Sequence, residues 1–410
     1  MKKISAGVIL ALGSVLGIPV ADADDDFKLN MGGRIQADYA TYFNNSLMGP
    51  AGAKLRRARL FAEGSIAHDW KYKFQYEFTG TGAAGFADAY FAYTGLSNTA
   101  ITLGQSKTFF SMDQLNSSND NVFMERPLLE GLDAYGNRRM GLKLTTHGAN
   151  WMLGLGGFAN ALNENLYTTY TPTTGAFRTG VTSTPTNQSG IYTISGRATF
   201  APLYAKGNVL YFGTNLNYTG FGENSAASAF STSPETSVTG RKLLSVYVSR
   251  PSSQFEYEVE TAVVAGPLAM EAAYVGLEAS RRGGLPSAHF DGYYVQASYT
   301  LTGQPRNFQP SVGEFHYLKD IGRGGAWEAA LRYDALNLND AKAGIYGGRG
   351  YNVSAGLNWY ANKHVRLMLE YSYAHIDSIP VTLPVGQSYT NNPINNGNVN
   401  ILQARGQFLF

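Results

Sequence analysis

The stretch Trp70-Lys71-Tyr72-Lys73-Phe74-Gln75-Tyr76-Glu77-Phe78 alternates strictly between aromatic side chains and charged or polar ones. Consecutive side chains of a β-strand point to opposite faces, so this pattern predicts a strand with one aromatic and one polar face. The buried face of a soluble β-sandwich favours aliphatic residues, whereas five successive aromatic positions fit a wall that faces lipid. The stretch therefore predicts a strand that crosses a membrane.

The same alternation returns at both ends of the chain, in residues 27–41, 365–373 and 398–410. Short turns, such as those near Ser97-Asn98 and Gly266-Pro267, are interleaved with long polar stretches at residues 162–190, 220–239 and 377–398. Short turns at one end and long loops at the other are typical of transmembrane β-barrels. The sequence therefore predicts an all-β protein, a transmembrane antiparallel barrel of roughly 16 strands.

The N-terminus has the features of a secretory signal peptide. Lys2 and Lys3 precede an apolar stretch that ends in Ala21-Asp22-Ala23, which matches an A-x-A cleavage site. We expect residues 1–23 to be the signal peptide and residues 24–410 to form one barrel domain. Export and the barrel pattern together predict a location in the bacterial outer membrane.

Composition and motifs argue against an enzyme. The chain has no cysteine, and its six histidines show no metal-ligand spacing, so we expect no catalytic residue, metal or cofactor. Residues 80–85 match the nucleotide-binding pattern G-x-G-x-x-G, but a strand-like aromatic segment follows where a helix is required, so we interpret them as a loop. The net charge of +2 gives no support to a nucleic-acid partner.

The polar faces of the clearest strands predict the charge of the pore wall. Assigning these faces to the lumen gives nine basic and six acidic positions. A few guanidinium groups weigh heavily in a narrow, low-dielectric constriction, and rings of Arg and Lys are the usual way to build an anion pore. The basic positions are Lys28, Arg34, Arg57, Arg59, Lys71, Lys73, Arg332, Arg366 and Arg405, and the acidic ones are Asp38, Glu63, Glu77, Glu328, Asp334 and Glu370.

The densest basic cluster is residues 54–59. Alternation turns Arg57 and Arg59 into the lumen and Arg56 toward lipid. Arg56 must then either snorkel to the rim or lie at a β-bulge that turns it inward. A third interpretation is that these arginines contact lipopolysaccharide phosphates outside the barrel.

The chain resembles the phosphate-selective porin O and P family. The blocks that carry this resemblance run in order through residues 24–410: 27–39, 55–58, 69–72, 88–90, 117–118, 125–126, 299–306, 325–328, 332–334 and 358–362. The resemblance implies a homotrimer of sixteen-stranded barrels, in which the loop after the fifth strand, here Ser111 to Tyr135, folds inward and narrows the pore. It also implies that basic side chains at the constriction hold the anion. Arg34, Arg56, Arg57 and Lys71 align with such positions, and Asp88 aligns with an acidic one.

We therefore predict a channel for small anions such as phosphate, surrounded by outer-membrane lipid and lipopolysaccharide. Gln114 and Glu314 stand where the family has lysines, and residues 220–239 lack its arginine-rich ladder, which predicts weak phosphate selectivity. Two alternatives stay open: a porin for small neutral polar solutes, and a structural or adhesive barrel. The predicted constriction residues are Arg34, Arg56, Arg57, Arg59, Lys71, Lys73, Asp88 and Gln114.

Overall fold

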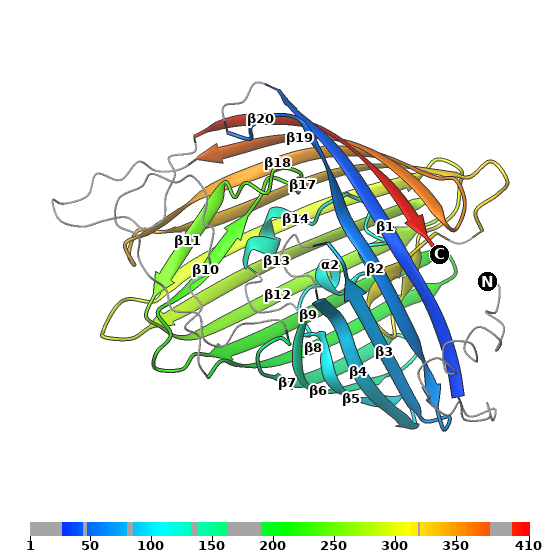
Figure 1. The fold of residues 1–410 in the computed structure, drawn as a ribbon, viewed down its shortest axis with the longest axis horizontal. Coiled ribbons are helices and arrows are strands. Elements are labelled where there is room, and N and C mark those ends of the chain that lie inside the picture. The colour runs from blue at the N-terminus through cyan, green and yellow to red at the C-terminus, as the bar shows by residue number, and fades with distance from the viewer. Residues whose placement is uncertain are drawn as a thin grey trace, which may run out of the picture.

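The computed structural model describes residues 27–43, 47–79, 85–132, 138–162, 190–318, 320–377 and 396–410. Sixteen of its strands form one closed barrel in which sequence neighbours pair antiparallel and β20 pairs with β1 (Figure 1). The predicted fold class and strand number are confirmed. The predicted signal peptide, residues 1–23, and most of the long stretches 162–190 and 377–398 lie outside the described residues.

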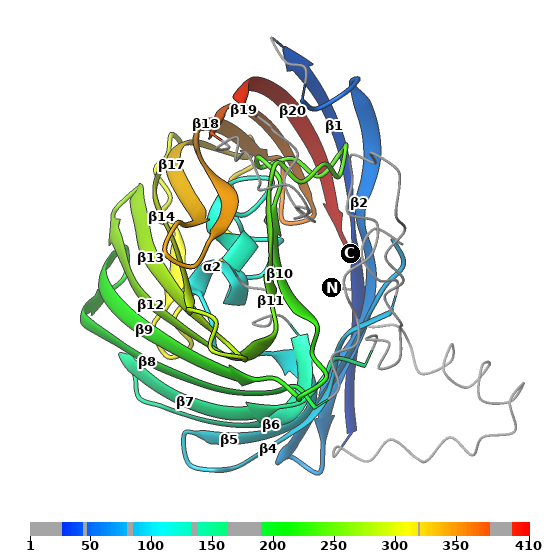
Figure 2. The ribbon, with the colours of Figure 1, turned by 90° about the vertical axis from the view of Figure 1, so that its left-hand side faces the viewer.

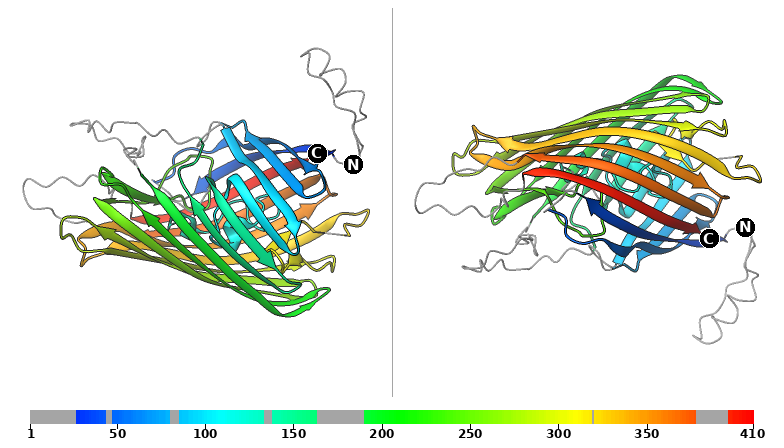
Figure 3. Two further views of the ribbon diagram at one scale, coloured as in Figure 1. Left: turned by 90° about the horizontal axis from the view of Figure 1, so that it is seen from below. Right: turned by 90° about the horizontal axis from the view of Figure 1, so that it is seen from above.

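The barrel strands follow one another around the wall and cross it at a steep tilt (Figure 3). They are β1 Phe27–Phe43, β2 Gly52–Ile66, β3 Trp70–Glu77, β4 Gly85–Leu96, β5 Thr99–Lys107, β6 Arg138–His147, β7 Trp151–Phe158, β8 Tyr192–Ala205, β9 Asn208–Gly220, β12 Pro251–Ala265, β13 Leu268–Arg281, β14 Ala288–Thr300, β17 Ala326–Asp340, β18 Ile345–Tyr360, β19 Val365–Asp377 and β20 Gly397–Leu409.

Side-chain alternation explains why these strands form a membrane barrel. In β1, Ile35 and Tyr39 are exposed on the outside, whereas Arg34, Gln36 and Asp38 are buried on the inside. The inner face is thus polar and the outer face apolar, as a lipid-facing wall requires. Of the nucleotide-motif candidate at residues 80–85, residues 80–84 lie outside the described residues, and Gly85 begins strand β4 and not a helix.

The barrel closes at its C-terminus. Gly33 N–H donates to the carbonyl of Phe410 (2.9 Å), and Phe410 N–H donates to the carbonyl of Gly33 (3.1 Å). A Cβ at Gly33 would lie 2.6 Å from the backbone carbonyl oxygen of Arg59 on the neighbouring strand, so this position requires glycine. The start of β1 and the end of β20 therefore lie at the same rim of the barrel. We take this rim as periplasmic because short turns lie there.

Two segments inside the barrel were not predicted. The first begins in residues 220–239, which the sequence predicted to be a long polar loop. Here strands β10 (Ala227–Thr232) and β11 (Leu244–Ser249) form a hairpin. This hairpin lies within the ring of barrel strands (Figure 2). Its Phe230, Leu244 and Val246 belong to the largest buried apolar cluster, which holds it against the wall.

The second inward segment starts from the periplasmic rim. Strands β15 (Asn307–Gln309) and β16 (Glu314–His316) pair within the connection from β14 to β17. The expectation of short turns throughout this rim is therefore wrong at residues 301–325. Phe308 and Phe315 pack into a buried apolar cluster with Tyr211, which pulls the segment into the lumen.

Helical structure is confined to one loop of the described chain. It contains α2 (Met112–Leu115) and the 3-10 helix η1 (Leu128–Leu132). Among the described residues, no helix has both the length and the apolarity needed to cross a membrane.

Candidate functional site

The loop between β5 and β6 crosses the lumen and is tied to the far wall by carboxylates. The N–H groups of Met112, Met124 and Leu128 donate to Glu260 (2.8 Å), Glu370 (2.9 Å) and Asp334 (3.0 Å). Each of these acids comes from a different strand of the far wall, respectively β12, β19 and β17. The predicted loop, Ser111 to Tyr135, does fold inward in its described part, residues 111–132, and we take this crossing as the constriction.

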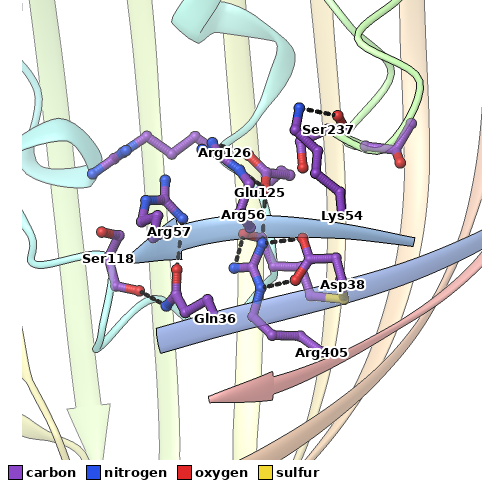
Figure 4. Close-up of polar contacts among 12 residues, drawn as sticks. Gln36, Asp38, Lys54, Arg56, Arg57, Ser118, Glu125, Arg126, Ser237 and Arg405 are labelled. Carbon is purple, nitrogen blue, oxygen red and sulfur yellow. Dashed lines mark hydrogen bonds and ion pairs between the residues drawn. The ribbon is translucent and has the colours of Figure 1, made fainter. Parts of the chain in front are cut away.

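A β-bulge brings two adjacent arginines into the lumen. Gln36 of β1 lies opposite Arg57, but the next residue, Ala37, lies opposite Leu55, so Arg56 is the extra residue of the bulge. Bulges re-aim side chains in this way. Arg56 and Arg57 therefore both contact lumen groups, as Figure 4 shows, and of the interpretations considered for Arg56 the inward bulge is the one observed.

Arg56 is neutralised by the loop. Its Nε and Nη2 donate to the two carboxylate oxygens of Glu125 at 2.6 and 2.8 Å. Glu125 also accepts from Arg405 (2.8 Å), which forms a second, two-pronged ion pair with Asp38 (2.7 Å). Burial alone would raise the pKa of Glu125, but the charges of Arg56 and Arg405 hold it well below its usual range. The network thus joins two guanidinium groups to two carboxylates, so its formal charges balance.

Arg34 and Arg57 differ, because each contacts a neutral amide. Arg34 Nη1 donates to Asn119 Oδ1 of the loop, and Arg57 Nη1 donates to Gln36 Oε1 (2.9 Å). Gln36 in turn donates to the Ser118 carbonyl (3.1 Å), which fixes its orientation (Figure 4). Both residues are 5 % exposed, and the buried Nε of each has no hydrogen-bond partner among the described residues.

Three further arginines lie near Arg34, and each has a carboxylate partner. Arg59, directly opposite Arg34 in the β1–β2 register, pairs with Glu77 (2.6 Å). Arg126 pairs with Asp113 (3.1 Å) and Arg138 with Asp88 (2.7 Å). The charges of Arg59, Arg126 and Arg138 all act on Arg34. The arrangement is a cluster of guanidinium groups in which Arg34 and Arg57 carry the uncompensated charge.

The structure brings together most of the predicted constriction residues but places Lys71 and Lys73 nearer the periplasmic turn. Lys71 lies opposite Ser65, close to the periplasmic turn after β2, and is exposed. Lys73 is ion-paired with Glu63 (2.8 Å) in the same part of the wall. Gln114 is buried in α2, where its amide donates to Glu130 (3.2 Å). Strand register places Lys71 and Lys73 closer to the turn between β2 and β3 than Glu77, the partner of Arg59.

The sequence interpretation missed Arg126 and Arg138 as members of the cluster. Arg126 lies in an irregular loop, where no periodicity indicates the direction of a side chain. Its Nε donates to the carbonyl of Asp113, so the loop itself holds the guanidinium in place. Arg138 begins β6, and its role depends on Asp88 of the neighbouring wall.

The acidic wall was also missed. Glu256, Glu258 and Glu260 line the inner face of β12, with Glu271 on β13. The sequence signal was present, since Phe255, Tyr257 and Val259 alternate with these acids, but the charge count of the clearest strands left it out. The charge count of the clearest strands therefore left out these acids, and it also left out buried basic wall residues such as Arg139 and Arg197.

Comparisons with known proteins agree with the architecture. The family model described as phosphate-selective porin O and P matches residues 29–410. Porin O of Pseudomonas aeruginosa is 27 % identical over 404 residues, covering 88 % of this chain and 86 % of that protein. An uncharacterized protein of Caulobacter vibrioides is 27 % identical over 328 residues, covering 78 % of this chain and 62 % of that protein.

Two solved structures have a similar fold. One is the trimer form of OmpT, an outer-membrane protein of Vibrio cholerae, with a TM-score of 0.57 at 10 % identity. The other is an anion-selective porin from Comamonas acidovorans, with a TM-score of 0.57 at 14 % identity. Both matches cover 94 % of this chain and 100 % of the other chain.

Proposed function

This chain belongs to the phosphate-selective porin O and P family of outer-membrane porins, and on that premise we propose that it is a diffusion channel for small anions such as phosphate. The observation that carries the anion preference is the pair Arg34 and Arg57. Both guanidinium groups are buried at the constriction, contact only neutral amides among the described residues, and keep an unpartnered N–H.

The chemistry of this pair matches an anion. A buried donor without a partner costs about 1–3 kcal/mol, and an anion removes that cost by accepting the hydrogen bond. Guanidinium groups bind phosphate-like anions through charge-assisted contacts that offset part of the lost hydration. The paired arginines contribute less, because Glu77, Asp113 and Asp88 already accept from Arg59, Arg126 and Arg138.

The functional protein is proposed to be a homotrimer embedded in outer-membrane lipid and lipopolysaccharide. Exposed aromatic side chains cover the outer face of β3 and β4, among them Trp70, Phe74 and Phe91. Such a face requires lipid or another barrel against it. An unboiled sample is expected to show a band that migrates as an oligomer, and boiling is expected to convert it to a faster-migrating monomer. Identical monomer mobility in both samples contradicts the assembly.

Planar-bilayer recording tests the anion preference. Purified protein in a gradient of potassium chloride is expected to give a reversal potential of the sign set by chloride, and added phosphate is expected to reduce the chloride current weakly. A reversal potential near zero, or one set by potassium, contradicts the proposal and favours a pore for neutral solutes.

A further inference from the structure

A pocket opens on the outside of the barrel near its extracellular rim. It has a volume of about 410 Å³ and lies across β14, β17, β18 and β19, which are neighbours in the wall (Figure 1). Its lining includes Asp291 and Asn337, which lie close to the strand ends farthest from the periplasmic rim. Ligand pockets in proteins have volumes of about 300–1,000 Å³, so this pocket is large enough for a small ligand.

Strand register forms the hollow. Ala335 of β17 lies directly opposite Tyr293 of β14 on one side and Tyr351 of β18 on the other. Side chains two residues apart on a strand share a face, so Tyr333 lies on the outer face with Ala335. The centroid of the Tyr333 ring is 6.0 Å from that of Tyr293 and 5.8 Å from that of Tyr351. Three aromatic rings thus surround a methyl group, and the small side chain of Ala335 leaves the space between them open.

A row of polar side chains borders the hollow on its extracellular side. The row consists of direct cross-strand neighbours on four successive strands: Asp291, Asn337, Arg349 and Asp377. Asn337 Nδ2 donates to Asp291 Oδ1 (3.4 Å). Arg349 Nε donates to Asp377 Oδ2 (2.9 Å). The Arg349 side chain is 66 % exposed, so its guanidinium group can reach a further partner.

This arrangement suits the level of the lipid headgroups. Charged side chains on a lipid-facing wall cost little near the interfaces and much more at the middle of the bilayer, and aromatic side chains gather at the interfaces. The three tyrosines therefore lie at the edge of the hydrocarbon layer, and the polar row lies among the headgroups. At the extracellular rim of an outer-membrane barrel, these headgroups belong to lipopolysaccharide.

The chemistry of the pocket favours a sugar over a phosphate group. Aromatic faces pack against the C–H groups of a sugar ring, while carboxylate, amide and guanidinium groups exchange hydrogen bonds with its hydroxyls. A phosphate group would meet the carboxylates of Asp291 and Asp377 and a single guanidinium, that of Arg349, which is already paired with Asp377. Carboxylates accept hydrogen bonds from hydroxyls but repel an anion, so these charges select the uncharged hydroxyls of a sugar.

We propose that this pocket binds a sugar ring of a lipopolysaccharide molecule in the outer leaflet. Tyr293 and Tyr351 pack against the ring, and Asp291, Asn337 and Arg349 bind its hydroxyls. The inference rests on the proposed place of the protein in lipopolysaccharide and does not depend on the anion preference of the pore. The lipid chains hold the sugar beside the wall, which raises its effective concentration at the pocket, so a shallow site is sufficient.

The variant Ala335→Trp tests the site, because its indole fills the hollow and keeps the outer face apolar. Binding is measured by native mass spectrometry of the protein in a detergent without sugar groups, titrated with purified lipopolysaccharide. We expect the apparent Kd of the first lipopolysaccharide bound to rise roughly tenfold. Asn337→Leu removes the hydrogen-bonding amide and keeps the hollow, and it is expected to raise this Kd roughly threefold.

A matched variant and a second lipid make the result specific. Ala355→Trp places the same ring on the exposed outer face of β18, outside the pocket lining, and is expected to bind lipopolysaccharide like wild type. Phosphatidylglycerol, an anionic lipid without a sugar, is expected to bind wild type and all three variants equally. Wild-type mobility on unboiled gels shows that each variant is folded. If Ala335→Trp does not fold, Asn337→Leu decides the question by the same titration.

The outcomes separate this inference from the proposed function. Unchanged lipopolysaccharide binding in the folded Ala335→Trp and Asn337→Leu variants, or an equal loss in Ala355→Trp, would overturn the sugar site. A matching loss of phosphatidylglycerol binding in Ala335→Trp would also overturn it, because the pocket would then accept lipid of any kind. Reversal potentials of the wild-type channel test the anion preference separately, so either proposal can fail while the other stands.

Discussion

The wall of β1 and β2 and the wall of β12 and β13 both turn buried charges into the lumen, but they use them differently. On β12, Glu260 accepts from Arg197 (2.7 Å), Tyr211 (2.6 Å) and the backbone of Met112, so its charge holds the loop in place. On β1 and β2, Arg34 and Arg57 contact only neutral amides among the described residues. The number of charges on a wall therefore says little about the field in the pore, because partners decide which charges remain.

The largest effect is expected from removing the two uncompensated charges. At an effective dielectric constant near 20, a charge pair about 4 Å apart is worth about 4 kcal/mol. Arg34→Ala combined with Arg57→Ala is therefore expected to lower the chloride-to-potassium permeability ratio by roughly tenfold or more. The matched variant Arg59→Gln with Glu77→Gln removes an ion pair and is expected to stay near wild type. Equal losses of anion selectivity in the two double variants would contradict the claim that carboxylate partners decide which charges act on the passing ion.

A smaller effect on selectivity, with a large one on stability, is expected from Glu125→Gln. This change leaves Arg56 and Arg405 without their shared carboxylate, so anion preference should rise. Removing one partner of a buried ion network costs about 3–5 kcal/mol, which should lower the temperature at which the barrel unfolds on gels. Unchanged heat resistance would show that the loop is held by its other contacts alone.

A modest effect is expected from Gln114→Lys. The family comparison by sequence favours a stronger phosphate block when this lysine is restored. The structure reduces that expectation, because Glu130 lies within hydrogen-bond distance of the Gln114 side chain and Asp113 is adjacent in the chain. A lysine here should gain carboxylate partners, so we expect it to strengthen phosphate block by no more than roughly threefold. A gain as large as the loss in the Arg34 and Arg57 variant would contradict the role of partners.

The smallest effect concerns pH. Burial of Asp120 in the constriction loop raises its pKa to about 6, although Arg306 and Arg366 oppose this shift. The folded state thus favours the protonated Asp120 carboxyl. The contribution of this group to the free energy of unfolding is therefore greatest below the pKa of Asp120 in the unfolded chain, and it is lost as the pH rises from there through about 6. Anion preference should likewise be slightly higher at pH 5 than at pH 7. Asp120→Asn should remove this dependence, and an unaltered pH profile in that variant would assign it to another group.

The sequence predicted what strand periodicity controls. Alternation turned Arg34 and Arg57 inward and marked Arg56 as the break where a bulge is found. It did not predict the partners, because Asn119 and Glu125 belong to an irregular loop whose path depends on contacts with distant strands. Nor did it reveal the hairpins β10–β11 and β15–β16, because their short strands are buried by packing inside the barrel and not by lipid.

The central claim is that an anion binds where guanidinium groups have neutral partners, and anomalous diffraction from crystals soaked in arsenate, a phosphate analogue, tests it most directly. We predict an arsenic peak with its oxygens at roughly 3 Å from Arg34 and Arg57. A peak only beside ion-paired arginines such as Arg56 or Arg405, with none at Arg34 and Arg57, would contradict the account.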